Sequence, residues 1–154
     1  MGFRIARRRT TAHGRRTHPM TVVILDSEAV SALHSTGTKR RLVLALLETA
    51  RAGRQRPTTR TFIVPTTVRV EAGWDRTAPA SAGANRHPIM DHVLDGQHAN
   101  VAARIRQQLK VSPADAHIGA AISSYPSGVE IAVITSDPDD IAAVSGGRAR
   151  IISI

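Results

Sequence analysis

Cysteine is absent from the 154 residues of this chain, and aromatic residues make up only 3% of them. Without cysteine the chain can form neither a disulfide framework nor a zinc site made of thiolates. Because aromatic side chains are scarce, a core has to be built from Val, Ile, Leu and Ala. Hydrophobic residues account for 42% of the sequence, which is typical of a folded domain and not of a disordered chain.

Long apolar segments are also missing. No apolar run approaches the roughly 18 residues that a membrane-spanning helix needs. No apolar segment of the signal-peptide type follows the basic N-terminus before residue 21. These absences predict a protein without a membrane segment and, with the lack of cysteine, favour a cytoplasmic location.

Acidic residues are lacking from the first 19 residues, which contain six arginines. The formal net charge of the chain is +9, and it falls to +3 when these six arginines are left out. A basic excess of this size favours a nucleic acid or an acidic partner. We interpret residues 1–20 either as a disordered basic arm or as an extension in front of a true translation start at Met20. Residues 21–154 have a length that suits one domain.

Short apolar runs rich in β-branched residues alternate with amphipathic segments along residues 21–154. The apolar runs predict strands at residues 21–25, 61–64, 89–94, 130–135 and 150–154. The other segments predict helices at 28–35, 39–52, 66–74, 97–110, 113–124 and 138–144, with a loop over 76–88. Strands that alternate with helices indicate a parallel sheet covered on both faces, which is a three-layer α/β/α domain.

Four acidic residues, called here the four acids, lie where such a sheet would bring them together: Asp26, Glu71, Asp115 and Asp137. Asp26 follows the first strand and Asp137 lies just past the fourth. In open parallel sheets, ligands bind outside the carboxyl ends of the strands. Glu71 and Asp115 lie near the starts of helices, which begin at that same edge. We therefore expect the four acids to converge there.

Each of the four acids also has an ordinary structural interpretation. Asp26 and Asp137 are suited to cap the helices that follow them. Asp115 completes a capping box that begins at Ser112, and Glu71 fits a solvated helix surface. Their common edge favours a shared site, because clustered carboxylates repel one another and a hard divalent cation removes that cost. Oxygen ligands suit Mg²⁺ or Mn²⁺, which serve phosphoryl chemistry.

The order and spacing of four segments resemble the motifs of the PIN-domain family and, within it, of the VapC-like toxins. The segments cover essentially all of residues 21–154 and are Val22–Asp26, Val64–Glu71, Asp115–Ala121 and Ile134–Asp140. The resemblance implies an α/β/α fold with a parallel sheet, and a Mg²⁺- or Mn²⁺-dependent endoribonuclease. The four acids would be its catalytic residues and metal ligands. Asp139 and Asp140 lie close enough in the sequence to share the role of Asp137.

The resemblance also implies a biological setting. It predicts the toxin component of a type II toxin–antitoxin pair, which cleaves RNA, dimerises with a second copy and is silenced by a cognate antitoxin protein. The alternative from a different functional class is a catalytically silent PIN-like module that binds RNA or protein. The presence of all four acids favours the enzyme.

Other residue types give weaker indications of function. Basic residues between Lys39 and Arg60 fit either RNA phosphates or a solvated helix face. Trp74 and Tyr125 are the only aromatic residues that we expect outside the core, so recognition of RNA by base stacking is not supported. The seven histidines lack the spacing of a zinc-binding helix, and we interpret all of them as structural.

The composition of the N-terminal segment leads to a first prediction. Deletion of residues 1–19 should leave folding intact, and any RNA cleavage at low salt unchanged, because the segment has no apolar periodicity that could join a core. Circular dichroism and a cleavage assay on the shortened chain would measure this. A deletion variant that does not fold would refute the prediction.

Overall fold

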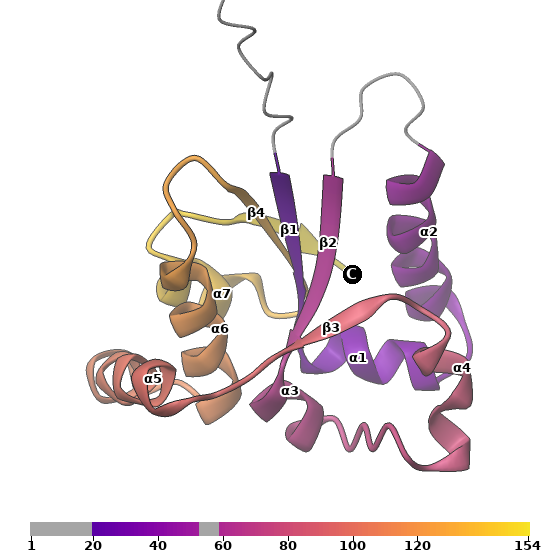
Figure 1. Cartoon of the computed structure of the whole chain (residues 1–154), viewed down its shortest axis with the longest axis horizontal. Coiled ribbons are helices and arrows are strands. Elements are labelled where there is room, and N and C mark those ends of the chain that lie inside the picture. Colours follow the sequence, from indigo (N-terminus) through magenta and orange to yellow (C-terminus); the bar gives the residue numbers. More distant parts are fainter. Residues whose placement is uncertain (1–19, 53–58) are drawn as a thin grey trace, which may run out of the picture.

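A computed structural model of the chain describes residues 20–52 and 59–154. The interpretation of residues 1–20 therefore falls, except for Met20, outside the described part. Five strands form one sheet in the order β3-β2-β1-β4-β5, and every neighbouring pair is parallel (Figure 1). The strands are β1 Met20–Leu25, β2 Thr59–Pro65, β3 Ile89–His92, β4 Glu130–Thr135 and β5 Arg150–Ser153. The predicted parallel sheet is confirmed.

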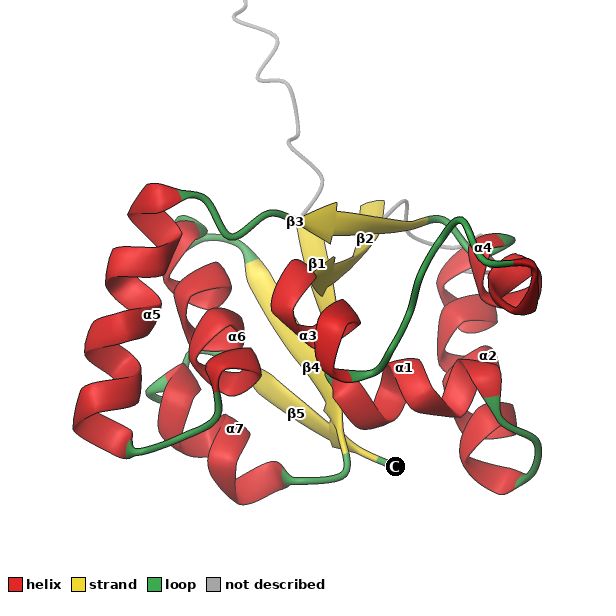
Figure 2. Ribbon diagram, turned by 90° about the horizontal axis from the view of Figure 1, so that it is seen from below, coloured by secondary structure: helices red, strands yellow, loops and turns green. Residues whose placement is uncertain are grey.

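Within residues 20–52 and 59–154, seven helices and one 3₁₀ turn flank this sheet. They are α1 Ser27–His34, α2 Thr38–Ala52, α3 Thr66–Glu71, the turn Pro79–Ser81, α4 Ala82–Asn85, α5 Gly96–Leu109, α6 Pro113–Ser124 and α7 Pro138–Ser145. Helices α5, α6 and α7 lie together on one side of the sheet, and α1, α2 and α4 lie on the other (Figure 2). The domain is therefore the three-layer α/β/α structure that the sequence predicts. Within the described ranges, no helix has the length and apolar character that a membrane span requires.

The centre of the sheet is almost completely closed to solvent. Residues 22–25 of β1 and 131–134 of β4 are all buried. Continuous apolar strands of this kind are expected in a parallel sheet that is covered on both faces. Because β1 and β4 are adjacent, the ends of these two strands bring residues about 110 positions apart in sequence to the same edge.

The segment predicted as one helix over residues 66–74 departs from expectation. Helix α3 ends at Glu71, and Gly73 follows with a left-handed φ of 65°, a conformation that glycine adopts without the usual steric cost. The chain then turns Trp74 inward, so that this residue is 2% exposed and its indole N–H donates to Asn85 Oδ1 at 3.1 Å. The prediction that Trp74 lies outside the core is wrong.

Charged residues hold this turn against the edge of the sheet. Arg69 and Arg76 both bind the carboxylate of Asp91 on β3, at 2.5 and 2.8 Å, and the Arg76 guanidinium lies 4.2 Å from the centre of the Trp74 ring. The predicted loop over 76–88 contains the 3₁₀ turn and α4, and the third strand ends at His92 two residues earlier than expected. These features depend on contacts between distant residues and not on local preference.

Close packing of α6 leads to a second prediction. A Cβ atom added at Gly119 would lie 2.9 Å from Ile105 Cδ1 and 3.0 Å from the carbonyl oxygen of Val144. Gly119→Ala should therefore destabilise the domain by about 1–3 kcal/mol through overpacking. Gly96→Ala is the matched control, because an added Cβ there meets no neighbour within 4 Å. Equal stability of the two variants in urea unfolding would contradict the prediction.

Candidate active site at the carboxyl edge of the sheet

Asp26 lies at the junction of β1 and α1 and is only 7% exposed. Its backbone N–H donates to the carbonyl oxygen of Ile134 at 3.1 Å, and its Oδ1 accepts from the N–H of Ala29 at 2.7 Å. Burial raises the pKa of Asp26, while hydrogen bonds from the Thr135 hydroxyl and from the N–H of Ala29 act against that rise. Asp26 is thus a helix cap, and it is also a desolvated carboxylate at the predicted edge.

Glu71 lies beside this junction although α3 follows a different strand. Its Oε2 accepts a hydrogen bond from the hydroxyl of Ser27, the residue next to Asp26. Glu71 is the last residue of α3 and is exposed to solvent. The contact brings the end of α3 to the beginning of α1, so Glu71 lies next to the residue that follows Asp26.

Asp115 occupies the first turn of α6 and is half-buried. Ser112 Oγ donates to Asp115 Oδ2 at 2.6 Å and accepts from the N–H of Asp115 at 3.0 Å. Burial raises the pKa of Asp115, the hydrogen bond from Ser112 lowers it, and the carboxylates of Asp140 and Glu71 raise it further. Acidic side chains of α3 and α7 therefore act on the α6 carboxylate of Asp115 at this edge.

Asp137 has a different surrounding from the other three acids. It is exposed and caps α7, where its Oδ1 accepts from the N–H of Asp140 at 3.4 Å. The α7 carboxylate that raises the pKa of Asp115 belongs to Asp140, one turn into the helix. Of the acids that the sequence leaves open for the fourth position, Asp140 is thus the one whose charge reaches Asp115.

The side chains of these acids do not point at one common centre. Within residues 20–52 and 59–154, no three His, Asp or Glu side chains are grouped closely enough to hold a metal ion. Each carboxylate is instead held by the nearest donor, which is the N–H of Ala29, the hydroxyl of Ser27, the hydroxyl of Ser112 or the N–H of Asp140. Carboxylates that repel one another are expected to take such separate partners.

Three histidines contact one another in a row beside the helices that carry Glu71 and Asp115. Their spacing in the sequence does not indicate these contacts. His117 of α6 is fully buried; its Nδ1 lies 2.9 Å from Thr67 Oγ1 and its Nε2 lies 3.1 Å from His92 Nδ1. His98, whose Nδ1 lies 2.8 Å from Asp95 Oδ1, packs edge-on against His92. Because Thr67 precedes Glu71 by one turn and His117 follows Asp115 by two residues, this chain joins the two helices that carry those acids.

An apolar pocket of about 360 Å³ opens beside Glu71, between α3 and the start of α6. We call it the rim pocket. Its lining residues are Thr66, Thr67, Val70, Glu71, Leu94, Pro113 and Ala114. Because Glu71 belongs both to the rim pocket and to the acidic edge, a ligand in one would extend into the other.

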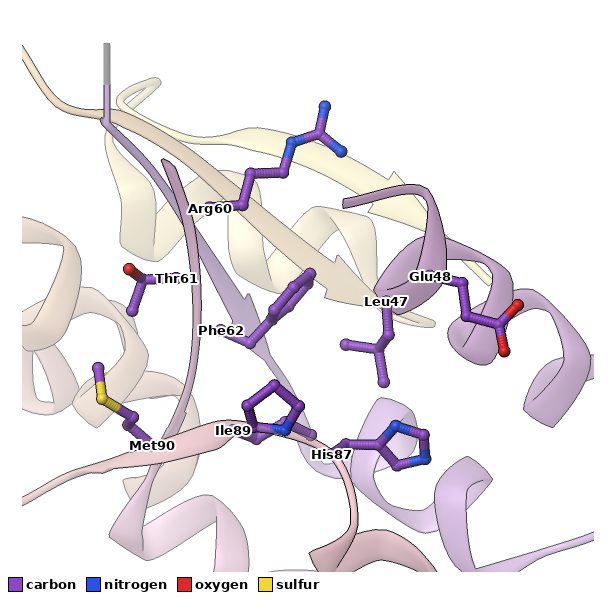
Figure 3. Close-up of a pocket in the computed structure, with 9 residues that line it drawn as sticks. Leu47, Glu48, Arg60, Thr61, Phe62, His87, Ile89 and Met90 are labelled. Atoms are coloured by element: carbon purple, nitrogen blue, oxygen red, sulfur yellow. The ribbon is translucent and has the colours of Figure 1, made fainter. Parts of the chain in front are cut away.

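A second pocket, of about 380 Å³, lies between α2 and the beginnings of β2 and β3. Leu47, Phe62 and Ile89 form its apolar interior, and Glu48, Arg60 and His87 also line it (Figure 3). This pocket is near the amino ends of the strands, at the opposite edge of the sheet from the acids. We therefore do not assign it to the candidate active site.

The comparisons with known proteins add no identification. No protein-family model matches the chain, and no curated protein matches its sequence. The candidate site therefore rests on the placement and the chemistry of the residues described above.

The histidine chain leads to a third prediction. Burial, and then the neighbouring charges of His92 and His98, lower the pKa of His117 to about 4, against about 6.5 in an unfolded chain. The imidazole is thus neutral in the fold. Its contribution to stability is complete above pH 6.5 and is lost as the pH falls towards 4, because the unfolded chain binds the proton more tightly. Titration of the imidazole nitrogens by NMR should find His117 neutral at pH 5.5. A midpoint near 6.5 would contradict this.

Proposed function

We propose that this protein is a Mg²⁺- or Mn²⁺-dependent endoribonuclease with its active site at the carboxyl edge of the sheet. The observation that carries the proposal is the placement of acids from several elements at this one edge. Asp26 is buried after β1, Glu71 accepts a hydrogen bond from the neighbouring Ser27, and the charges of Glu71 and Asp140 act on Asp115. The repulsion between these carboxylates is unfavourable in the absence of a cation.

The donor chemistry of the edge fits a hard divalent cation. The available ligands are carboxylate and hydroxyl oxygens, which Mg²⁺ and Mn²⁺ prefer. Asp26, Glu71 and Asp115 would hold the cation, together with Asp137 or Asp140. When bound, such an ion lowers the pKa of a water molecule and offsets the negative charge that develops on the phosphate. Binding would require the carboxylates to turn from their present partners towards a common centre.

The residues around the acids have supporting roles in this proposal. The hydroxyls of Ser27 and Ser112 orient Glu71 and Asp115 through hydrogen bonds. The N–H of Ala29 fixes the carboxylate of Asp26. The contact of Thr67 with the buried His117 keeps α3 against α6. No covalent nucleophile is needed, because hydrolysis of a phosphodiester can proceed by direct attack of water.

The biological setting is proposed from the resemblance to VapC-like toxins. In this setting the chain is the toxin of a type II toxin–antitoxin pair, acts as a homodimer on RNA in the cytoplasm, and is silenced by an antitoxin. The net charge of +9 suits an RNA substrate. Within the basic stretch, Lys39 pairs with Glu28, while Arg54 and Arg56 lie outside the described residues.

The alternative, a catalytically silent PIN-like module that binds RNA or protein, has one observation in its favour. The acidic side chains of the described residues form no ready-made group of three around a common point. A silent module would bind RNA with or without a divalent cation and would leave it uncut. The cleavage assay below therefore separates the two functions.

The fourth prediction tests the enzyme directly. Asp26→Asn should reduce RNA cleavage in Mg²⁺ or Mn²⁺ by roughly 100-fold or more, because a cation that stabilises charge in the transition state contributes several kcal/mol. An asparagine oxygen can still accept from the N–H of Ala29, so the variant should fold. Initial cleavage rates and melting temperatures in EDTA are to be measured on the same preparations.

Glu48→Gln is the matched control for this experiment. Glu48 is an exposed acid of α2 near the opposite edge of the sheet, and its substitution should leave cleavage unchanged. Undiminished cleavage by the folded Asp26→Asn variant would refute the assignment of the site. RNA binding without cleavage by the unaltered protein, with either cation, would favour the silent module.

A further inference from the structure

Aromatic side chains are not available for base recognition at the acidic edge in the described part of the chain. Phe62 and Trp74 are 6% and 2% exposed and belong to the core. Tyr125 caps the end of α6, ten residues and about three helical turns beyond Asp115. A base of a bound nucleic acid near the acids would therefore meet no Phe, Tyr or Trp ring of the described residues.

The rim pocket offers such an aliphatic surface. Val70 is 82% exposed, the largest exposure among the large hydrophobic residues described, and it directly precedes Glu71. Leu94 and Pro113 complete the apolar walls, and Ala114 is buried in the lining. Val70 therefore presents an exposed apolar side chain at the mouth of the rim pocket, where a bound ligand would cover it.

Polar atoms in the lining of the pocket can form hydrogen bonds with the edge of a planar ligand. Thr66 Oγ1 accepts from the N–H of Leu94 at 3.2 Å, and Thr67 Oγ1 lies 2.9 Å from His117 Nδ1. A hydroxyl that makes one hydrogen bond can still make another. An apolar pocket with a few placed polar groups is the usual form of a small-ligand site.

The position of the rim pocket selects the occupant. Glu71 lines the pocket and also acts on Asp115, so a ligand in the pocket extends towards the acids. A nucleotide has the matching form, with a flat, weakly polar base joined through a ribose to a phosphate.

We propose that the rim pocket binds the nucleobase next to the scissile phosphate, and that Val70 and Leu94 determine which base is preferred. This inference rests on the proposed endoribonuclease function and adds a substrate-recognition site to it. Recognition would depend on shape and on the threonine hydroxyls, and not on aromatic stacking.

The fifth prediction concerns Val70→Ala, with Val93→Ala as its matched control. Val93 is also an exposed valine, at 61%, but it does not line the pocket. Short RNAs that differ in the base on either side of one linkage serve as substrates. Val70→Ala should raise KM for the preferred base by roughly tenfold and weaken the base preference, as expected when methyl groups are lost from an apolar pocket. Val93→Ala should leave both unchanged. Because Val70 is exposed, its truncation should not affect folding.

A binding experiment separates this inference from the proposed catalysis. The four nucleoside 5′-monophosphates and ribose 5-phosphate are titrated against the protein with Mg²⁺, and NMR shifts of residues in the rim pocket are followed. At least one monophosphate should bind more tightly than ribose 5-phosphate, and Val70→Ala should abolish the difference.

Two further outcomes would overturn the inference. One is equal binding of all these ligands, or a base preference that Val70→Ala leaves intact. The other is a change in self-association by Val70→Ala, measured by sedimentation, without a change in nucleotide binding, which would assign the pocket to a second copy of the chain. Failure of the unaltered protein to cut any RNA would instead refute the proposed function, and the monophosphate titrations would still decide whether the pocket binds bases.

Discussion

The backbone and side chain of Asp26 connect three elements at the carboxyl edge of the sheet. Its N–H continues the ladder between β1 and β4, and its carboxylate begins α1 by accepting from the N–H of Ala29. The side chain is almost entirely removed from water, which disfavours its charged form. Ser27 follows Asp26 directly and donates to Glu71, so the end of α3 lies beside the start of α1.

The second constraint is the attachment of α3 to α6. Helix α3 follows β2, whereas α6 follows α5. They carry Glu71 and Asp115, so their separation decides whether the two carboxylates can act on the same ligand. Thr67 of α3 and His92 of β3 both contact the buried imidazole of His117 on α6. A buried polar group that is hydrogen-bonded holds a specific arrangement, because a shift would leave it without partners. The rim pocket lies in the same interface and shares Thr67 and Glu71 with it.

Helix capping and ligand binding are compatible roles for the acids of this edge. Asp26, Asp115 and Asp137 all lie at helix starts and engage backbone N–H or hydroxyl donors there. The positive end of a helix favours a carboxylate, which helps to offset the repulsion between acids gathered at one edge.

Much of the architecture follows from the sequence alone, because hydrophobic periodicity and helix punctuation are local properties. The apolar run before Asp26 and the capping residues Ser112 and Asp137 determine where β1, α6 and α7 lie, and the alternation of elements determines a parallel sheet. This alternation placed the four acids near one edge of the sheet without any structure.

Only the tertiary structure decided that Trp74 is buried, that Ser27 reaches Glu71, that Asp140 acts on Asp115 and that His117 meets Thr67 and His92. Those contacts join residues from 25 to 50 positions apart or lie between separate helices, and they depend on how packed elements turn their side chains, which no local pattern in the sequence specifies.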